Sequence, residues 1–350
     1  MNNNSKANKK NELLKGILLG ITLVLVLLII VIQVEKSFTF TTEELPEISD
    51  LELQSKTNNK YQTIIIADNK YTGINVNSKK SAKKLIEKDS IKQKDTCSDK
   101  IISIENKMIK DFDITAVNLC EMDVSLANEL YDVLAKIYKE YPTVRGYMTN
   151  ISLRNSSIEN DKVIAAFIPT FEFAKSDTLS TYPWIYKTEI LLNANYFLNR
   201  DKLSNTVFDA TTSGYFPPNA TMYSPVAHEF GHYLSFIALL KKHSTKDLVL
   251  VEKDERKEVY KIAYDYSKGI YSKKILEEAY NNYINDTGSE INFVTWSRTI
   301  SSYAITKDED GAYIYDETIA EAFHDTYLNG NNAKDASKYI TNVLKDKLRG

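Results

Sequence analysis

The chain has 350 residues, of which 43% are hydrophobic, so it is long enough for two domains or for one large domain with appendages. Its charge is balanced, with 44 basic against 47 acidic residues. Because no cluster of Lys and Arg is interleaved with aromatic residues, the sequence argues against a nucleic-acid partner.

An uncharged apolar run covers residues 16–34 near the N-terminus. Nineteen residues at about 1.5 Å each span roughly 28 Å, which is enough to cross the hydrocarbon core of a bilayer. Lysines precede the run and glutamates follow it, so the positive-inside bias predicts a cytoplasmic tail over residues 1–15 and an extracellular remainder. We therefore expect a single-pass cell-membrane protein, with 16–34 as its transmembrane anchor.

A cleaved secretory signal is the alternative for this run, and it would make the protein secreted. Signal peptides usually have a shorter apolar region, of about 7–15 residues, and end at a small-residue cleavage site. The end of the apolar run reads "VIQVEKSF" and has no such cleavage site. The sequence therefore favours the uncleaved anchor.

The segment after the anchor divides into two parts. Residues 35–60 are polar with weak periodicity and read as a stalk or linker. Residues 61–97 combine a short β-rich run with a basic helical stretch. The chain's two cysteines, Cys97 and Cys120, lack C-x-x-C spacing, so we expect either a disulfide in an oxidising compartment or two buried thiols.

Residues 98–350 have the pattern of a compact domain. Apolar residues at helical spacing predict a helix over Val124–Tyr138, which Pro142 ends. Strand-like runs follow at Val144–Leu153, Lys162–Phe173 and Trp184–Asn193. The later part is mostly helical, with predicted helices at 224–243, at two stretches near 246–285, at Glu317–Leu328 and at Ala333–Leu348. Strands before helices indicate an α+β fold.

The helix predicted over 224–243 contains the segment "SPVAHEFGHYLSF". Ser224 is a good N-cap residue, and Pro225 fits the first helical position. The apolar residues on one face, Ala227, Phe230, Leu234 and Ile237, should point into the core. Gly231 costs about 1 kcal/mol relative to Ala, and its missing side chain would let another segment approach closely.

Two of the chain's four histidines lie four residues apart on this helix, as His228 and His232. That spacing places both imidazoles on one face, where they can reach a single Zn²⁺ at about 2.0–2.1 Å. Glu229 would lie next to the metal, where a carboxylate can take a proton from a zinc-bound water. The alternative is two surface histidines that share a helix by chance.

A catalytic zinc needs a third protein ligand. A metzincin continuation is excluded, because Ser235 stands where it requires Gly and Ala238 where it requires His. The segment "ETIAEAFHD" instead places Glu317 and Glu321 four apart on one helical face. One carboxylate could bind zinc while the other accepts the N–H of a ligand histidine, and the alternative is a solvated helix face.

The chain resembles the catalytic domain of anthrax lethal factor and the Pro-Pro endopeptidase family of secreted bacterial zinc proteases. The resemblance rests on "HEFGH", "SSYAIT" and "ETIAEAFHD" and covers Ser98 to the C-terminus, specifically at the zinc motif and loosely elsewhere. It implies a zincin-like, gluzincin-type fold. It also implies that His228, His232 and Glu317 hold one Zn²⁺ while Glu321 orients a ligand histidine.

The resemblance also implies two features of substrate handling. The tyrosine of "SSYAIT", Tyr303, would face the metal and stabilise the oxyanion. The inserted "KDEDGAYIYD" separates it from the ligand glutamate, so Tyr313 and Tyr315 remain alternatives, as does a packing role for Tyr303. The family's substrate-binding edge strand would correspond to Trp184–Asn193, whose alternative is an ordinary interior strand.

We therefore expect a membrane-anchored extracellular zinc endopeptidase that acts on a peptide or protein, with Glu229 as general base. One alternative is a zincin-fold surface binding module without turnover, and another is a zinc amidase that acts on cell-wall peptide. His324 is expected on a helix surface, and His243 has no evident role.

Overall fold

The structure is a computed structural model, and it describes residues 65–66, 97–154, 163–175, 181–243, 256–308 and 310–349. The expected tail, anchor and stalk lie outside the described residues, as does most of the 61–97 segment. None of the helices in the described part of the chain is both long enough and apolar enough to cross a membrane.

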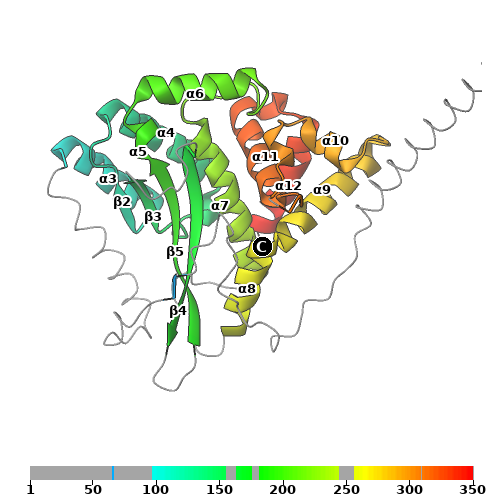
Figure 1. Cartoon of the computed structure of the whole chain (residues 1–350), viewed down its shortest axis with the longest axis horizontal. Helices are drawn as coiled ribbons and strands as arrows, with labels where there is room; N and C mark the ends of the chain where they lie inside the picture. Colours follow the sequence, from blue (N-terminus) through cyan, green and yellow to red (C-terminus); the bar gives the residue numbers. More distant parts are fainter. Residues whose placement is uncertain are drawn as a thin grey trace, which may run out of the picture. The chain divides into compact units, whose positions relative to one another are not determined.

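Five of the described strands form one mixed sheet in the order β1-β4-β5-β3-β2 (Figure 1). The strands are β1 Ile65–Ile66, β2 Ala116–Asn118, β3 Asn150–Arg154, β4 Ala165–Lys175 and β5 Thr181–Asn193. β4 and β5 pair antiparallel, and β3 pairs parallel with both β5 and β2. The strand predicted at Trp184–Asn193 is therefore interior, and its expected role as an edge strand is wrong.

The sheet edge nearest the helix that contains His228 and His232 belongs to β4. β1 pairs with β4 only at Glu172 and Phe173, so the stretch Ala165–Thr170 has no neighbour among the described strands except β5. Within this stretch Pro169 stands opposite Thr188. Proline has no N–H to donate to the hydrogen-bond ladder of a sheet. It therefore suits a position whose backbone N and C=O point away from β5.

The helices are α3 Asp99–Phe112, α4 Val124–Glu140, α5 Ala194–Phe197, α6 Arg200–Thr212, α7 Ser224–Lys242, α8 Arg256–Lys268, α9 Ile270–Thr287, α10 Phe293–Arg298, α11 Tyr315–Asn329 and α12 Asp335–Arg349. Most of them follow the sheet in the chain, and the α+β class expected from the sequence is confirmed. Short 3₁₀ turns complete the described elements, among them η5 at Tyr303–Ile305.

Helix α7 lies at the centre of the domain. It packs against β4 and β5 and also against α11 and α12 (Figure 1). The predicted core face is buried, and so is nearly all of the remaining surface from Ser224 to Leu240. On the sheet side, the ring of Phe167 packs against Tyr233 and Phe236, with 5.9 Å between ring centroids in each pair. A helix buried on all sides holds the side chains along it at fixed positions.

The start of α7 differs from the prediction in one detail. Ser224 is the first helical residue, and Tyr223 is the N-cap. The Ser224 hydroxyl donates to the carbonyl oxygen of Thr221 at 2.7 Å, so it does not accept an N–H of the helix as an N-cap side chain would.

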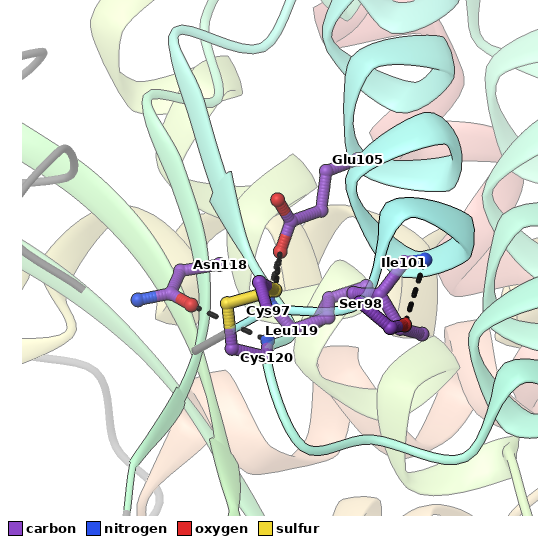
Figure 2. The surroundings of a disulfide bond; sticks show 7 residues. All are labelled: Cys97, Ser98, Ile101, Glu105, Asn118, Leu119 and Cys120. Carbon is purple, nitrogen blue, oxygen red and sulfur yellow. Dashed lines mark hydrogen bonds between the residues drawn. A yellow bond between two sulfur atoms is a disulfide. The ribbon is translucent and has the colours of Figure 1, made fainter. Parts of the chain in front are cut away.

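A disulfide joins Cys97 to Cys120, as one of the two sequence alternatives predicted (Figure 2). It links the start of α3 to the segment after β2. Beside it, the buried Glu105 accepts a hydrogen bond from the Leu119 backbone N–H at 2.6 Å. Two connections therefore fix α3 to the segment that directly follows β2.

Candidate metal centre

Helices α7 and α11 approach each other closely at Gly231. A Cβ atom added to Gly231 would lie 2.5 Å from the Cα of Ala320, which is shorter than real Cβ contacts. The segment that approaches closely at Gly231, as the sequence predicted, is therefore the backbone of α11. This contact places Glu317 and Glu321, which flank Ala320 on α11, opposite the two histidines of α7.

Three side-chain atoms from these helices form a small triangle. His228 Nε2 lies 3.1 Å from His232 Nε2 and 3.1 Å from Glu317 Oε2, and the third side, from His232 Nε2 to Glu317 Oε2, is 3.3 Å. Zn²⁺ with tetrahedral ligands at 2.0–2.1 Å separates neighbouring ligand atoms by about 3.3–3.4 Å. The group can therefore hold a metal ion.

The other ring nitrogen of each histidine meets a carboxylate. His228 Nδ1 lies 2.7 Å from Glu321 Oε1, and His232 Nδ1 lies 2.6 Å from Asp316 Oδ2. An ionised carboxylate only accepts hydrogen bonds, so each Nδ1 carries a proton, and once Nε2 gives up its own proton to a metal its lone pair faces the triangle. The tautomers required of two metal ligands are thus already selected.

Asp316 was not identified from the sequence. It directly precedes Glu317 in the sequence. Spacing along α11 gives no sign that Asp316 contacts His232, because that contact depends on how α11 packs against α7. Its other oxygen, Oδ1, accepts a hydrogen bond from the Ser272 hydroxyl of α9 at 3.0 Å. The carboxylate is therefore held from both sides, and α9 takes part in orienting His232.

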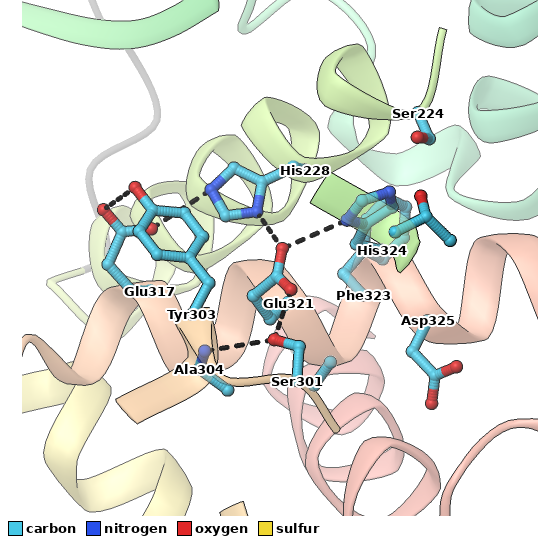
Figure 3. Close-up of polar contacts among 12 residues, drawn as sticks. Ser224, His228, Ser301, Tyr303, Ala304, Glu317, Glu321, Phe323, His324 and Asp325 are labelled. Carbon is cyan, nitrogen blue, oxygen red and sulfur yellow. Dashed lines mark hydrogen bonds and ion pairs between the residues drawn. The ribbon is translucent and has the colours of Figure 1, made fainter. Parts of the chain in front are cut away.

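Glu321 is fully buried and surrounded by donors (Figure 3). Besides His228, it receives hydrogen bonds from the Ser301 hydroxyl at 2.5 Å and from His324 Nδ1 at 3.0 Å. The expectation that His324 lies on a helix surface is wrong, because its side chain is completely buried. The ring of Phe216, from the loop before α7, packs against it at 5.3 Å.

Tyr303 lies at the candidate metal centre. Its hydroxyl donates to Glu317 Oε1 at 3.1 Å, and its ring stacks on His228 with 5.4 Å between centroids (Figure 3). The insertion that separates it from Glu317 folds back on itself, because Ile314 N donates to Thr306 O at 3.0 Å. The two ends of the insertion therefore meet, and Tyr303 stays beside the ligand glutamate.

The two alternative tyrosines have contacts elsewhere. The ammonium of Lys307 lies 4.5 Å from the ring centroid of Tyr313, and that of Lys273 lies 5.9 Å from that of Tyr315. Among the three tyrosines considered from the sequence, the structure places Tyr303 at the candidate ligands.

A further tyrosine, Tyr215, reaches the centre from the loop after α6. Its ring stacks on Tyr303 with centroids 4.7 Å apart, and 44% of the residue remains exposed. Partial burial and the charges of Glu317 and Glu321 raise the pKa of Tyr215 to about 12. Sequence reasoning missed it, because no spacing relates this loop to the zinc motif.

Glu229 lies between the triangle and the sheet. Its side chain is buried, and Oε2 accepts a hydrogen bond from the Phe167 backbone N–H at 2.6 Å. This N–H points away from β5, toward the edge of β4 where no other described strand pairs. Burial raises the pKa of Glu229, and the charges of His228 and His232 act in the opposite direction. A carboxyl group with a raised pKa suits a general base.

The electrostatics of the cluster favour a cation. Burial by itself would lower the pKa of His228, but hydrogen bonds to Glu317 and Glu321 outweigh burial and raise it to about 10. The pKa of Glu321 falls to about 2 because its hydrogen bonds from His228 and His324 outweigh burial. In the metal-free protein the carboxylates therefore attract protons to the imidazoles, and a metal ion would supply the same positive charge.

Comparisons of the chain with protein-family models, with curated proteins and with solved structures give no match. Conclusions about function therefore depend on the geometry and chemistry of the site.

Proposed function

We propose that the protein is a zinc-dependent endopeptidase of the zincin type, similar to the lethal factor and Pro-Pro endopeptidase proteases. The observation that carries this proposal is the triangle of His228 Nε2, His232 Nε2 and Glu317 Oε2, with sides of 3.1–3.3 Å. Two imidazoles and one carboxylate form a donor set that Zn²⁺ uses in hydrolases, with a further position left for water or substrate.

Zn²⁺ in this site would polarise a peptide carbonyl and lower the pKa of water to about 7. Glu229 takes the proton from the attacking water and passes it to the leaving amine. The raised pKa of Glu229 helps it to hold that proton between the two transfers. The hydroxyl of Tyr303, which bonds Glu317 in the free protein, turns toward the developing oxyanion.

The free edge of β4 supplies the substrate-binding strand in place of β5. Its backbone carbonyls at Ala165, Phe167 and Pro169 face away from β5, where an extended peptide could pair with them. The Phe167 N–H at this edge bonds Glu229. A peptide on this edge therefore lies directly beside the general base.

The same proposal places the catalytic domain outside the cell. Disulfides persist in oxidising compartments, which agrees with the Cys97–Cys120 bridge. The apolar run over 16–34 would then anchor the chain in the cell membrane, with residues 1–15 in the cytoplasm.

The test is Glu229→Gln in the full-length protein, assayed with a peptide library and for bound zinc. We expect full zinc content and a loss of hydrolysis of at least about 10³-fold, because the amide cannot accept the proton. Glu290→Gln makes the same chemical change at an exposed position and serves as the matched control. Hydrolysis by Glu229→Gln at the control rate would refute the role of Glu229.

A further inference from the structure

Glu321 is held by two imidazoles at a single oxygen. His228 Nδ1 lies 2.7 Å from Oε1, and His324 Nδ1 lies 3.0 Å from the same atom (Figure 3). The second oxygen, Oε2, accepts the Ser301 hydroxyl at 2.5 Å, and Ser301 Oγ accepts the Ala304 backbone N–H at 3.1 Å. Donors thus occupy both ends of the carboxylate.

The hydrogen-bond chemistry fixes the state of His324. A carboxylate offers only acceptors, so the proton of His324 lies on Nδ1. The other ring nitrogen, Nε2, is buried and has no hydrogen-bond partner among the described residues. The ring of Phe216 packs against the imidazole at 5.3 Å in an edge-on arrangement.

A buried polar atom without a partner is unfavourable, so packing alone does not account for a histidine here. An apolar side chain would fill the same space without that penalty. What the imidazole adds is the Nδ1–H donor to Glu321 Oε1. Without it, the donor on Oε1 would be His228 itself, the ring that Glu321 has to hold, and Ser301 anchors only Oε2. His324 anchors Oε1 independently of His228.

We infer that His324 is a positioning residue of the metal centre, which acts through Glu321 to hold the His228 ring in its ligating orientation. The inference depends on the metal site of the proposed function. Among the described residues, the polar contact of His324 is with Glu321, and it has no hydrogen bond or ion pair with His232 or Glu317. The order of contact is His324, then Glu321, then His228, then the metal.

The test compares three substitutions of His324 in the full-length protein. In His324→Asn, the side-chain amide can keep a donor near the position of Nδ1. In His324→Gln, the amide lies one methylene group farther from the backbone, and His324→Leu removes the donor. The zinc dissociation constant is measured by competition with a chelator, and the visible spectrum of the cobalt-substituted protein reports ligand geometry. Thermal unfolding of the metal-free variants reports folding separately.

We expect His324→Leu and His324→Gln to weaken zinc binding about tenfold, at the lower end of the effect of groups that hydrogen-bond metal ligands. His324→Asn should stay within about threefold of the wild type, because it restores the donor. The cobalt spectrum should change in the His324→Leu and His324→Gln variants and should match that of the wild type in His324→Asn. His243→Leu and His243→Gln, at the C-terminal end of α7, are matched controls and should leave both readouts unchanged.

The outcomes separate this inference from the proposed function. Equal zinc affinity and equal cobalt spectra in wild type, Asn and Gln would overturn the positioning role, whether or not the Leu variant folds. Weakening by the same factor in Asn and Gln, in step with their unfolding temperatures, would also overturn it, because that pattern indicates packing alone. A wild-type protein that binds neither metal would instead refute the proposed metal centre.

Discussion

At the residue scale, the side chains on the predicted helices could be identified from spacing alone. His228, Glu229 and His232 follow from one motif, and Glu317 and Glu321 from a second, because helical periodicity fixes which residues share a face. Asp316 and His324 lie on the same helix as the two glutamates, and Tyr215 lies on a loop, but their roles could not be identified in this way. These three residues acquire their contacts from the way distant segments pack, and no local pattern encodes that.

Asp316 provides a direct test at this scale. Asp316→Ala removes the acceptor for His232 Nδ1, so zinc binding should weaken about 10- to 100-fold, as measured by chelator competition. Asp316→Asn keeps an acceptor oxygen and should lose less. Asp335→Ala, at the exposed start of α12, is the control. An Asp316→Ala protein with wild-type zinc affinity would show that the hydrogen bond to His232 has no effect on the metal.

Gly231 gives a second test. The Cβ of Gly231→Ala would lie 2.5 Å from the Cα of Ala320, so α11 must move away from α7. We expect a loss of about 1–3 kcal/mol in the free energy of unfolding, together with weaker zinc binding. The clash involves backbone atoms, and adding Ala320→Gly should therefore restore neither quantity. Urea unfolding and chelator competition measure the two effects. Wild-type stability in Gly231→Ala would contradict the close approach.

At the scale of elements, the sequence predicted which segments are strands and helices better than how they are arranged. The strands at Lys162–Phe173 and Trp184–Asn193 both exist, but the edge next to the metal centre belongs to β4. Strand order depends on pairing between distant segments, and the apolar pattern of β5 fits an interior strand as well as an edge. Pro169 in β4 was a signal for an edge strand that the sequence did contain.

The loop after α6 contributes Tyr215 to the site, and its exposed ring offers a surface for a substrate side chain. Tyr215→Ala should lower kcat/KM about three- to tenfold, mainly through KM, because one aromatic contact is lost. Tyr215→Phe should keep most of the activity, and zinc affinity should stay unchanged in both. Phe208→Ala, at a more exposed aromatic residue on α6, is the control. An unchanged KM in Tyr215→Ala would exclude substrate contact there.

The pairing of α7 with α11 also predicts a pH dependence for the metal-free protein. The pKa of His228 is raised from 6.5 to about 10, so its contribution to stability is complete below pH 6.5 and is lost as the pH rises toward 10. The pKa of Glu321 is lowered from 4.5 to about 2, so its contribution is complete above pH 4.5 and is lost as the pH falls toward 2.

This cluster therefore stabilises the metal-free fold most between about pH 4.5 and 6.5. Urea unfolding of chelator-treated protein across pH 3–9 measures the dependence. Zinc displaces protons from the imidazoles, so added zinc should stabilise the protein more as the pH rises through this range. Metal-free stability that increased steadily from pH 6.5 to 9 would contradict the arrangement of imidazoles and carboxylates.

At the scale of the whole molecule, the α+β class followed from the order of the elements, and the disulfide was one of two alternatives for the cysteines. Cys97 and Cys120 enclose a loop with a sequence separation of 23. Replacing both with Ser should lower the free energy of unfolding by about 3 kcal/mol. Zinc affinity should remain unchanged, because the bridge joins α3 to the segment after β2 and the candidate ligands lie on α7 and α11. Equal unfolding curves for variant and wild type, measured without reductant, would show that the bridge does not stabilise the fold.

Binding of a single zinc ion between α7 and α11 is the claim on which the rest depends. Its most direct test is calorimetric titration of Zn²⁺ into the full-length, metal-free protein, with the His228→Ala/Glu317→Ala double variant in parallel. We predict one ion per chain for the wild type and no binding of comparable affinity for the variant. Absence of zinc binding in the wild type, or equal binding by the variant, would contradict the account.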